Sequence, residues 1–128
     1  MGMSEEYVPE WGWLCMAAAE GDYPLIGSRA DERRYKTVLY KKAEIEMGKI
    51  TDYTCKNGAV ITVIKGTDMI GARRIVNAAN ASFAKYKKLS GENVIFANWK
   101  PEPLNSPERY MEFLIKIFNL FYVADLPV

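Results

Sequence analysis

Histidine is absent from the 128 residues of this chain. Because histidine is the commonest general base and the commonest metal ligand, a Ser–His or Cys–His catalytic triad and a Cys2His2 zinc site are excluded. The two cysteines, Cys15 and Cys55, lack the spacing of a metal-binding pair. An enzyme built from this chain would have to use carboxylates, tyrosine, lysine or arginine. We therefore expect a binding protein rather than an enzyme, with no metal and no cofactor.

Long apolar runs are also missing, since no stretch reaches the roughly 20 apolar residues that span a bilayer. The first ten residues carry Glu5, Glu6 and Glu10 and no basic residue, unlike a signal peptide. We expect a cytoplasmic protein (in the host cell's cytoplasm if a phage encodes it) with reduced thiols and no contact with membranes. The length predicts one domain over residues 1–128, with residues 1–10 as a flexible N-terminal segment.

Basic residues are missing from residues 1–28, which carry five acids. Residues 29–91 carry fourteen basic and six acidic residues, a formal charge of +8, and residues 92–128 carry −2. A basic middle between acidic ends predicts contact with a polyanion, that is, nucleic acid or a nucleic-acid-bound protein. The other interpretation is that these charges only solvate the outer faces of helices. The candidate contact residues are Arg29, Arg33, Arg34, Arg73, Arg74, Lys85, Lys87 and Lys88.

The apolar and turn patterns predict a small α+β domain with an antiparallel sheet of about four or five strands. Residues 11–19 suit a buried strand, and residues 25–28 and 93–97 suit two shorter strands, while residues 101–103 look like a loop. The clearest signal is a β-hairpin over residues 50–64. Its centre is Asn-Gly, which accepts the positive φ angles that a type I′ turn requires.

Three helices are expected, at about residues 29–41, 68–88 and 106–123. Ser28 can cap the first helix, but Tyr35 and Tyr40 also have strand propensity, so helix and strand both stay open for residues 29–47. Thr67 or Asp68 can cap the second helix. The third helix begins at a Ser-Pro-Glu sequence, which combines a capping hydroxyl with proline at the first helical position.

The last helix is apolar around much of its circumference, because Phe113, Ile117 and Leu120 form a stripe beside its main one. Such a helix lies centrally in the core or is covered by a partner. Trp11 and Trp13 share a face if they lie on a strand, as a core or interface edge or as a platform for stacked bases. These five residues are the predicted interaction surface, and the predicted partner is another protein or a second copy of the chain.

The pentapeptide Val76-Asn77-Ala78-Ala79-Asn80 matches the asparagine-containing turn that lines the ADP-ribose pocket of macrodomains. In that family the turn follows a buried strand and precedes glycines that let the backbone approach phosphates. Here Gly71-Ala72-Arg73-Arg74 precedes the pentapeptide, and no glycine follows before Gly91. Apolar residues recur through the segment at helical spacing. We therefore predict a helix, with ADP-ribose binding as the minor alternative.

Short motifs over about residues 11–99 resemble the GIY-YIG nuclease fold, in the phage and bacterial branch typified by the T5orf172 domain. Residues 12–16 resemble its opening strand, and residues 23–28 resemble its "KIG" strand. Asp31-Glu32-Arg33-Arg34 is similar to the start of its first helix, and residues 72–86 are similar to its second helix.

The residues that this family uses for cleavage are mostly replaced. Leu25 stands at the second tyrosine, Val76 at the metal-binding glutamate and Asn80 at the histidine, while the helix arginine persists. Valine cannot bind Mg²⁺, which requires oxygen ligands. The resemblance implies a non-catalytic phage or mobile-element accessory factor, or an inhibitor, that engages nucleic acid or a protein–nucleic-acid complex. A metal-dependent nuclease that uses Asp31 or Glu32 is the third alternative.

Overall fold

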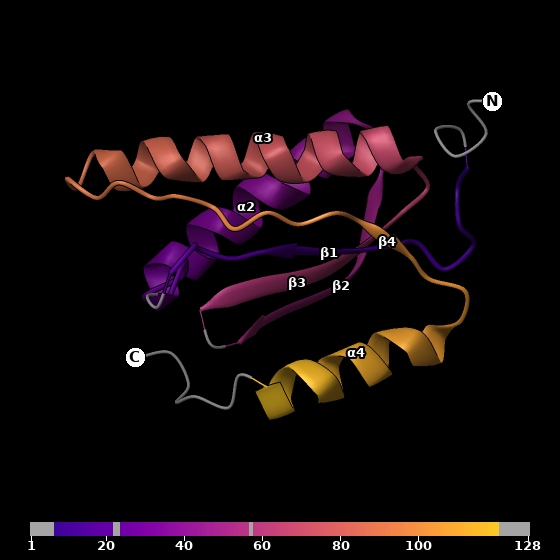
Figure 1. Ribbon diagram of the computed structural model, residues 1–128. Coiled ribbons are helices and arrows are strands. Elements are labelled where there is room, and N and C mark those ends of the chain that lie inside the picture. Colours follow the sequence, from indigo (N-terminus) through magenta and orange to yellow (C-terminus); the bar gives the residue numbers. More distant parts are fainter. Residues whose placement is uncertain (1–6, 22–23, 57, 121–128) are drawn as a thin grey trace.

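The computed structural model describes residues 7–21, 24–56 and 58–120, the last five of these by their backbone alone. In this part of the chain, an antiparallel sheet in the order β2-β3-β1-β4 is covered by helices on both faces (Figure 1). The strands are β1 (Trp13–Ala17), β2 (Lys49–Lys56), β3 (Ala59–Lys65) and β4 (Glu102–Pro103). The helices are α2 (Arg29–Ile45), α3 (Met69–Lys88) and α4 (Pro107–Leu120). The predicted α+β class is confirmed.

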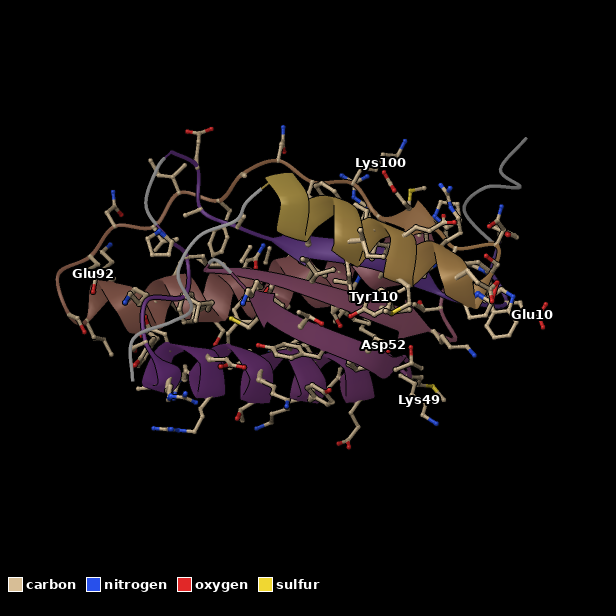
Figure 2. The ribbon with its side chains drawn as sticks, turned by 90° about the horizontal axis from the view of Figure 1, so that it is seen from below. Glu10, Lys49, Asp52, Glu92, Lys100 and Tyr110 are labelled. Carbon is tan, nitrogen blue, oxygen red and sulfur yellow. The ribbon has the colours of Figure 1, made fainter. Side chains whose placement is uncertain are left out.

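Two hydrophobic cores lie on the two faces of the sheet. Alternate side chains of β1 and β3 point to opposite faces, so Trp13 and Ile64 pack under α2 and α3 while Leu14 and Val63 pack under α4. Tyr110 of α4 lies against the hairpin in Figure 2, and its hydroxyl is 2.9 Å from Oγ1 of Thr54 on β2. Because both faces of β3 are buried, its interior residues are apolar on both sides apart from Thr62, rather than alternating.

The hairpin of β2 and β3 is confirmed, and its register leaves only residues 57 and 58 between the paired Lys56 and Ala59. Gly58 has a φ of +76°, a left-handed conformation that glycine adopts at no steric cost. A Cβ at Gly58 would also meet the backbone and side chain of Pro24. The turn is therefore packed against the segment that leads into α2.

The helix predicted at about residues 29–41 is confirmed, and α2 continues four residues beyond the predicted end. Tyr35, Leu39 and Ala43 recur every four residues and are all buried, so packing decides against the strand propensity. Oγ of Ser28 accepts the Asp31 backbone N–H at 3.1 Å and caps the helix. Asp68 caps α3 in the same way, which places the asparagine pentapeptide in the middle of a helix as predicted. Among the described helices, none is long and apolar enough to cross a bilayer.

Three local expectations are wrong. Residues 25–28 form no strand, because Ile26 makes one backbone hydrogen bond to Gly58 (3.0 Å) and the chain then turns directly into α2. Residues 93–97 are reduced to the single bridge between Ala19 and Phe96. The true edge strand is β4, predicted as a loop; its proline is tolerated because an edge strand has a side without a partner.

Trp11 and Trp13 do not share a face, contrary to prediction. Gly12 between them has a φ of +92°, and β1 begins only at Trp13, so the alternation of a strand does not extend back to Trp11. Trp13 is 1% exposed and belongs to the core under α2 and α3, whereas Trp11 packs with the core under α4. Tyr7 contacts the Trp13 ring edge-on, so the expected flexible segment 1–10 is attached to the core from residue 7 onward.

Candidate functional site: a basic helix pair and a polar groove

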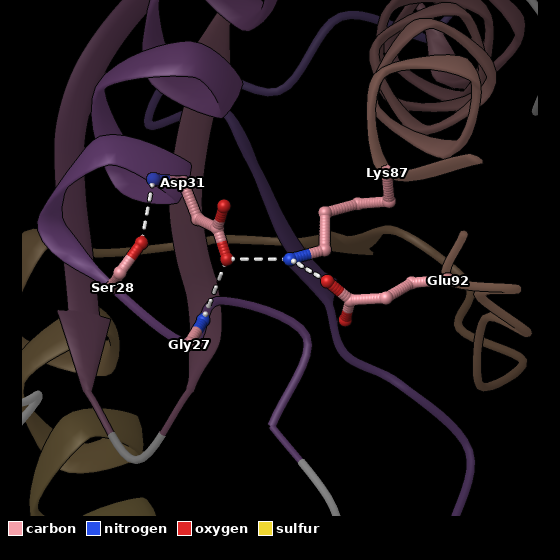
Figure 3. Close-up of polar contacts among 5 residues, drawn as sticks. All are labelled: Gly27, Ser28, Asp31, Lys87 and Glu92. Atoms are coloured by element: carbon pink, nitrogen blue, oxygen red, sulfur yellow. Dashed lines mark hydrogen bonds and ion pairs between the residues drawn. The ribbon is translucent and has the colours of Figure 1, made fainter. Parts of the chain in front are cut away.

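A buried polar junction joins the start of α2 to the end of α3 (Figure 3). The Asp31 side chain is 8% exposed, and its carboxylate accepts hydrogen bonds from the Lys87 ammonium at 2.9 Å and from the Gly27 backbone N–H at 3.1 Å. Lys87 also contacts Glu92 at 3.1 Å. The Asp31 carboxylate is therefore occupied within the protein.

The predicted basic contact residues are divided between the two ends of this helix pair. Asp31 of α2 pairs with Lys87 of α3, and Glu46, just after α2, pairs with Arg74, so the two helices run in opposite directions. Arg29, Arg33, Arg34, Lys85 and Lys88 therefore lie toward one end, and Arg73 and Arg74 toward the other. The two ends lie roughly 20 Å apart along α3, since Arg74 and Lys87 are separated by thirteen residues of about 1.5 Å rise each.

Not all of these cations are available to a partner. The Lys87 side chain is 12% exposed and held by two carboxylates, so we remove it from the predicted contact surface. Arg34 lies over the ring of Tyr86, and Arg74 is paired with Glu46 at 3.3 Å. On α2 and α3, the cations that are exposed and lie neither beside an acidic partner nor over an aromatic ring among the described residues are Arg29, Arg33, Lys41, Arg73, Lys85 and Lys88. We call these six residues the basic face.

Charge is segregated between the helix pair and the rest of the chain. Together, α2 and α3 hold eleven basic and three acidic residues, a formal charge of +8. Since the whole chain carries +1, all remaining residues together carry −7. The positive charge of the central segment in the sequence therefore lies on one layer of the fold, formed by α2 and α3.

A polar groove lies at the outer edge of β1. This edge pairs with β4 at Trp13 and Leu14, and further along it only the bridge from Ala19 to Phe96 is described. Between these two points, a groove of about 260 Å³ opens between α3 and residues 96–101. In Figure 1 the orange segment that leads to β4 passes between α3 and β1.

Amides and N–H donors dominate the lining of this groove. Arg73, Asn77 and Asn80 come from α3, and Asn98 and Trp99 come from the facing segment, with no aspartate or glutamate among the lining residues. Oδ1 of Asn80 accepts a buried tyrosine hydroxyl at 2.6 Å, which leaves its amide nitrogen as the free donor. The Trp99 indole N–H is buried without an acceptor among the described residues, and such a donor costs about 1–3 kcal/mol.

The sequence drew attention to Asn77 and Asn80 for a different reason and missed Asn98 and Trp99. The pentapeptide suggested a turn around a ligand, whereas both of its asparagines face the groove from a helix. Asn98 and Trp99 follow residues 93–97, whose sequence suggested a short strand but gave no sign of contact with α3. Only the fold brings this segment to α3.

Both cysteines have raised pKa values, as do Tyr35 and Tyr53. Burial raises the pKa of Cys15 to about 12, and burial with a smaller contribution from Glu32 raises the pKa of Cys55 to about 12. Burial also raises the pKa of Tyr35 and Tyr53 well above the ordinary tyrosine value. These groups stay protonated near neutral pH, and only the deprotonated form is a nucleophile or base. No group of three or more acids or cysteines in the described part of the chain is arranged to hold a metal ion.

The predicted apolar interaction surface is largely used inside the protein. Trp13 is buried, and Phe113 is half-buried against Trp99 with ring centroids 5.9 Å apart. The side chains of Ile117 and Leu120 lie outside the described residues. The apolar side chains that α4 does expose are Met111 and Ile115, at 56% and 57%.

No protein-family model matches this chain, and neither a curated protein nor a solved structure matches it.

Proposed function

We propose that this protein is a non-catalytic nucleic-acid-binding protein that uses the basic face of α2 and α3. The observation that carries the proposal is the segregation of charge, with +8 on the helix pair and −7 on the remainder. A layer of one sign attracts a polyanion over a long range. The GIY-YIG resemblance, with its cleavage residues replaced, agrees with binding without cleavage.

The six cations of the basic face are suited to phosphate contacts. Each is exposed and lacks an acidic partner among the described residues, so binding a phosphate breaks no internal ion pair. Their distribution over two ends of the helix pair fits an extended backbone better than a single phosphate group. Such contacts set affinity and position but carry no sequence information by themselves.

The salt dependence of binding tests this proposal. We would measure fluorescence anisotropy of labelled oligonucleotides between 50 and 200 mM salt. If all six cations contact phosphates, the slope of log K against log salt is about −4 to −5, depending on whether the strand is single or double. Exchange of Arg33 and Lys85 for glutamine should reduce that slope by about 2, since each lost contact removes roughly one unit.

A matched control removes the same amount of charge elsewhere. Lys49 on β2 and Arg109 on α4 are exposed and lie outside the helix pair. Exchange of both for glutamine should leave affinity and slope nearly unchanged. Equal losses of affinity in the two double variants would show that net charge alone attracts the oligonucleotide. If the wild-type chain shows no salt-sensitive binding, the proposal is refuted.

A protein-interaction role for α4 is the second candidate. Met111 and Ile115 lie one helical turn apart, and both are more than half exposed. If they form a self-association surface, sedimentation velocity should show a concentration-dependent dimer that Met111→Glu with Ile115→Glu abolishes. A monomer at all concentrations, with no partner recovered through this helix, would exclude that role.

A further inference from the structure

The groove beside β1 is connected to the basic face through Arg73. Arg73 is exposed on α3 and also lines the groove, so a strand that contacts the basic face passes the groove mouth. The groove has room for a small ring system rather than a large ligand, since pockets for drug-sized molecules span roughly 300–1,000 Å³ and this one is about 260 Å³. A ligand unit attached to a phosphate backbone suits this place.

The chemistry of the lining selects for acceptor atoms on a neutral, flat group. Asn77 and Asn98 each offer an amide donor and an amide acceptor, and Asn80 offers its amide nitrogen. The edge of a nucleobase likewise alternates donors and acceptors. Phe96 and Trp99 add aromatic surface, on which bases stack irrespective of sequence.

We infer that the groove receives one unpaired base of a bound strand, with the neighbouring phosphate on Arg73 and the base edge among the asparagine amides. This inference rests on the proposed nucleic-acid binding and narrows it to single strands. A paired base is held inside the duplex and reaches such a pocket only if it is flipped out. The protein should therefore prefer single-stranded over double-stranded nucleic acid of the same sequence and length.

The experiment compares single-stranded and duplex 12-mers by anisotropy, with the full chain and two double variants. Asn77→Ala with Asn98→Ala removes two exposed amides of the groove, while Asn93→Ala with Asn105→Ala removes two exposed amides elsewhere. We expect wild type and control to bind the single strand at least tenfold more tightly. We expect the groove variant to lose most of that preference, with duplex affinity and salt slope unchanged.

A second measurement addresses the groove without variants and without an oligonucleotide. Titration of the wild-type chain with a nucleoside monophosphate should shift the Trp99 indole and the Asn77 and Asn98 side-chain amide signals in NMR spectra. Inorganic phosphate and free nucleoside, titrated separately, should shift these signals less, since each lacks half of the ligand.

The possible results separate the two ideas. Salt-dependent binding with equal affinity for single strand and duplex, and no effect of the groove variant, would overturn the groove assignment and leave the proposed function standing. Shifts of the groove signals by the monophosphate without any oligonucleotide binding would support the groove and overturn the proposed function. Shifts by inorganic phosphate alone would show a general anion contact at Arg73 and would also overturn the assignment of a base.

Discussion

Replacement of Lys87 by methionine should destabilise the protein strongly, although lysine is usually a surface residue. Its ammonium lies 2.9 Å from the carboxylate of Asp31, whose side chain is 8% exposed. Methionine keeps much of the aliphatic stem but removes the charge. The variant therefore leaves a buried carboxylate with one remaining described donor, the backbone N–H of Gly27 at 3.1 Å.

The expected loss can be worked out from this geometry. Removal of one partner from a buried ion pair costs about 3–5 kcal/mol, because the remaining charge stays desolvated. Here the 12% exposure of the Lys87 side chain admits some water. The hydrogen bond from the Gly27 N–H offsets a further part of this cost, so we expect the free energy of unfolding to fall by about 2–3 kcal/mol. The contact of Lys87 with Glu92, whose side chain is 58% exposed, adds little, since exposed pairs contribute about 0–1 kcal/mol.

Urea unfolding followed by circular dichroism measures this loss. The midpoint should fall by about 1–2 M, because proteins of this size have slopes of roughly 1–3 kcal/mol per M. The control is Lys88→Met, which removes an exposed cation from the adjacent position and should change stability by no more than about 0.5 kcal/mol. Asp31→Asn combined with Lys87→Met should recover much of the loss, since no buried charge is left. Equal effects of the two single lysine variants, or strict additivity in the double variant, would refute the reasoning.

The stability difference between wild type and Lys87→Met should depend on pH, because it follows the protonation of Lys87. Burial by itself lowers this pKa, but the hydrogen bonds and charges of Asp31 and Glu92 raise it above 10.5, its ordinary value. A raised pKa in the folded state stabilises the protein below the unfolded pKa, and this stabilisation is lost as pH rises through the folded pKa. The stability difference between wild type and Lys87→Met should be constant from neutral pH to about pH 10 and should shrink at higher pH.

Three further predictions concern single side chains. Gly58→Ala should lower the free energy of unfolding in urea by at least about 2 kcal/mol, because alanine is strained at this positive φ and its Cβ would meet Pro24. A loss below about 0.5 kcal/mol would contradict this expectation. Tyr53→Phe removes a buried hydroxyl without a described partner and should leave the free energy of unfolding equal or higher. Tyr35→Phe breaks a hydrogen bond to α3 and should lower the free energy of unfolding by about 1 kcal/mol. A larger loss in Tyr53→Phe than in Tyr35→Phe would contradict the structure. Because burial raises the pKa of Cys15 to about 12, its alkylation by iodoacetamide at pH 8 should require unfolding, and rapid labelling of the native protein would contradict its burial.

The sequence predicted those features of the fold that depend on near neighbours. The caps Ser28 and Asp68 act on residues three positions away, and the hairpin turn acts between residues that are adjacent in the chain. Helical periodicity also placed the asparagine pentapeptide inside α3. The partners in these interactions are close along the chain, so a short sequence pattern can reveal them.

What the sequence alone determined, then, are the helices that begin at Met69 and Pro107, the hairpin and the +8 charge of the central segment, while packing decided for a helix from Arg29. Only the tertiary structure decided which residues meet. It put Trp13 into the core on the opposite face from Trp11, withdrew Lys87 from the surface by pairing it with Asp31, 56 positions away, and gave the edge of β1 to residues 102–103 instead of 93–97. Such pairings depend on how whole elements pack, and packing is set by the combined burial of many side chains rather than by any local pattern.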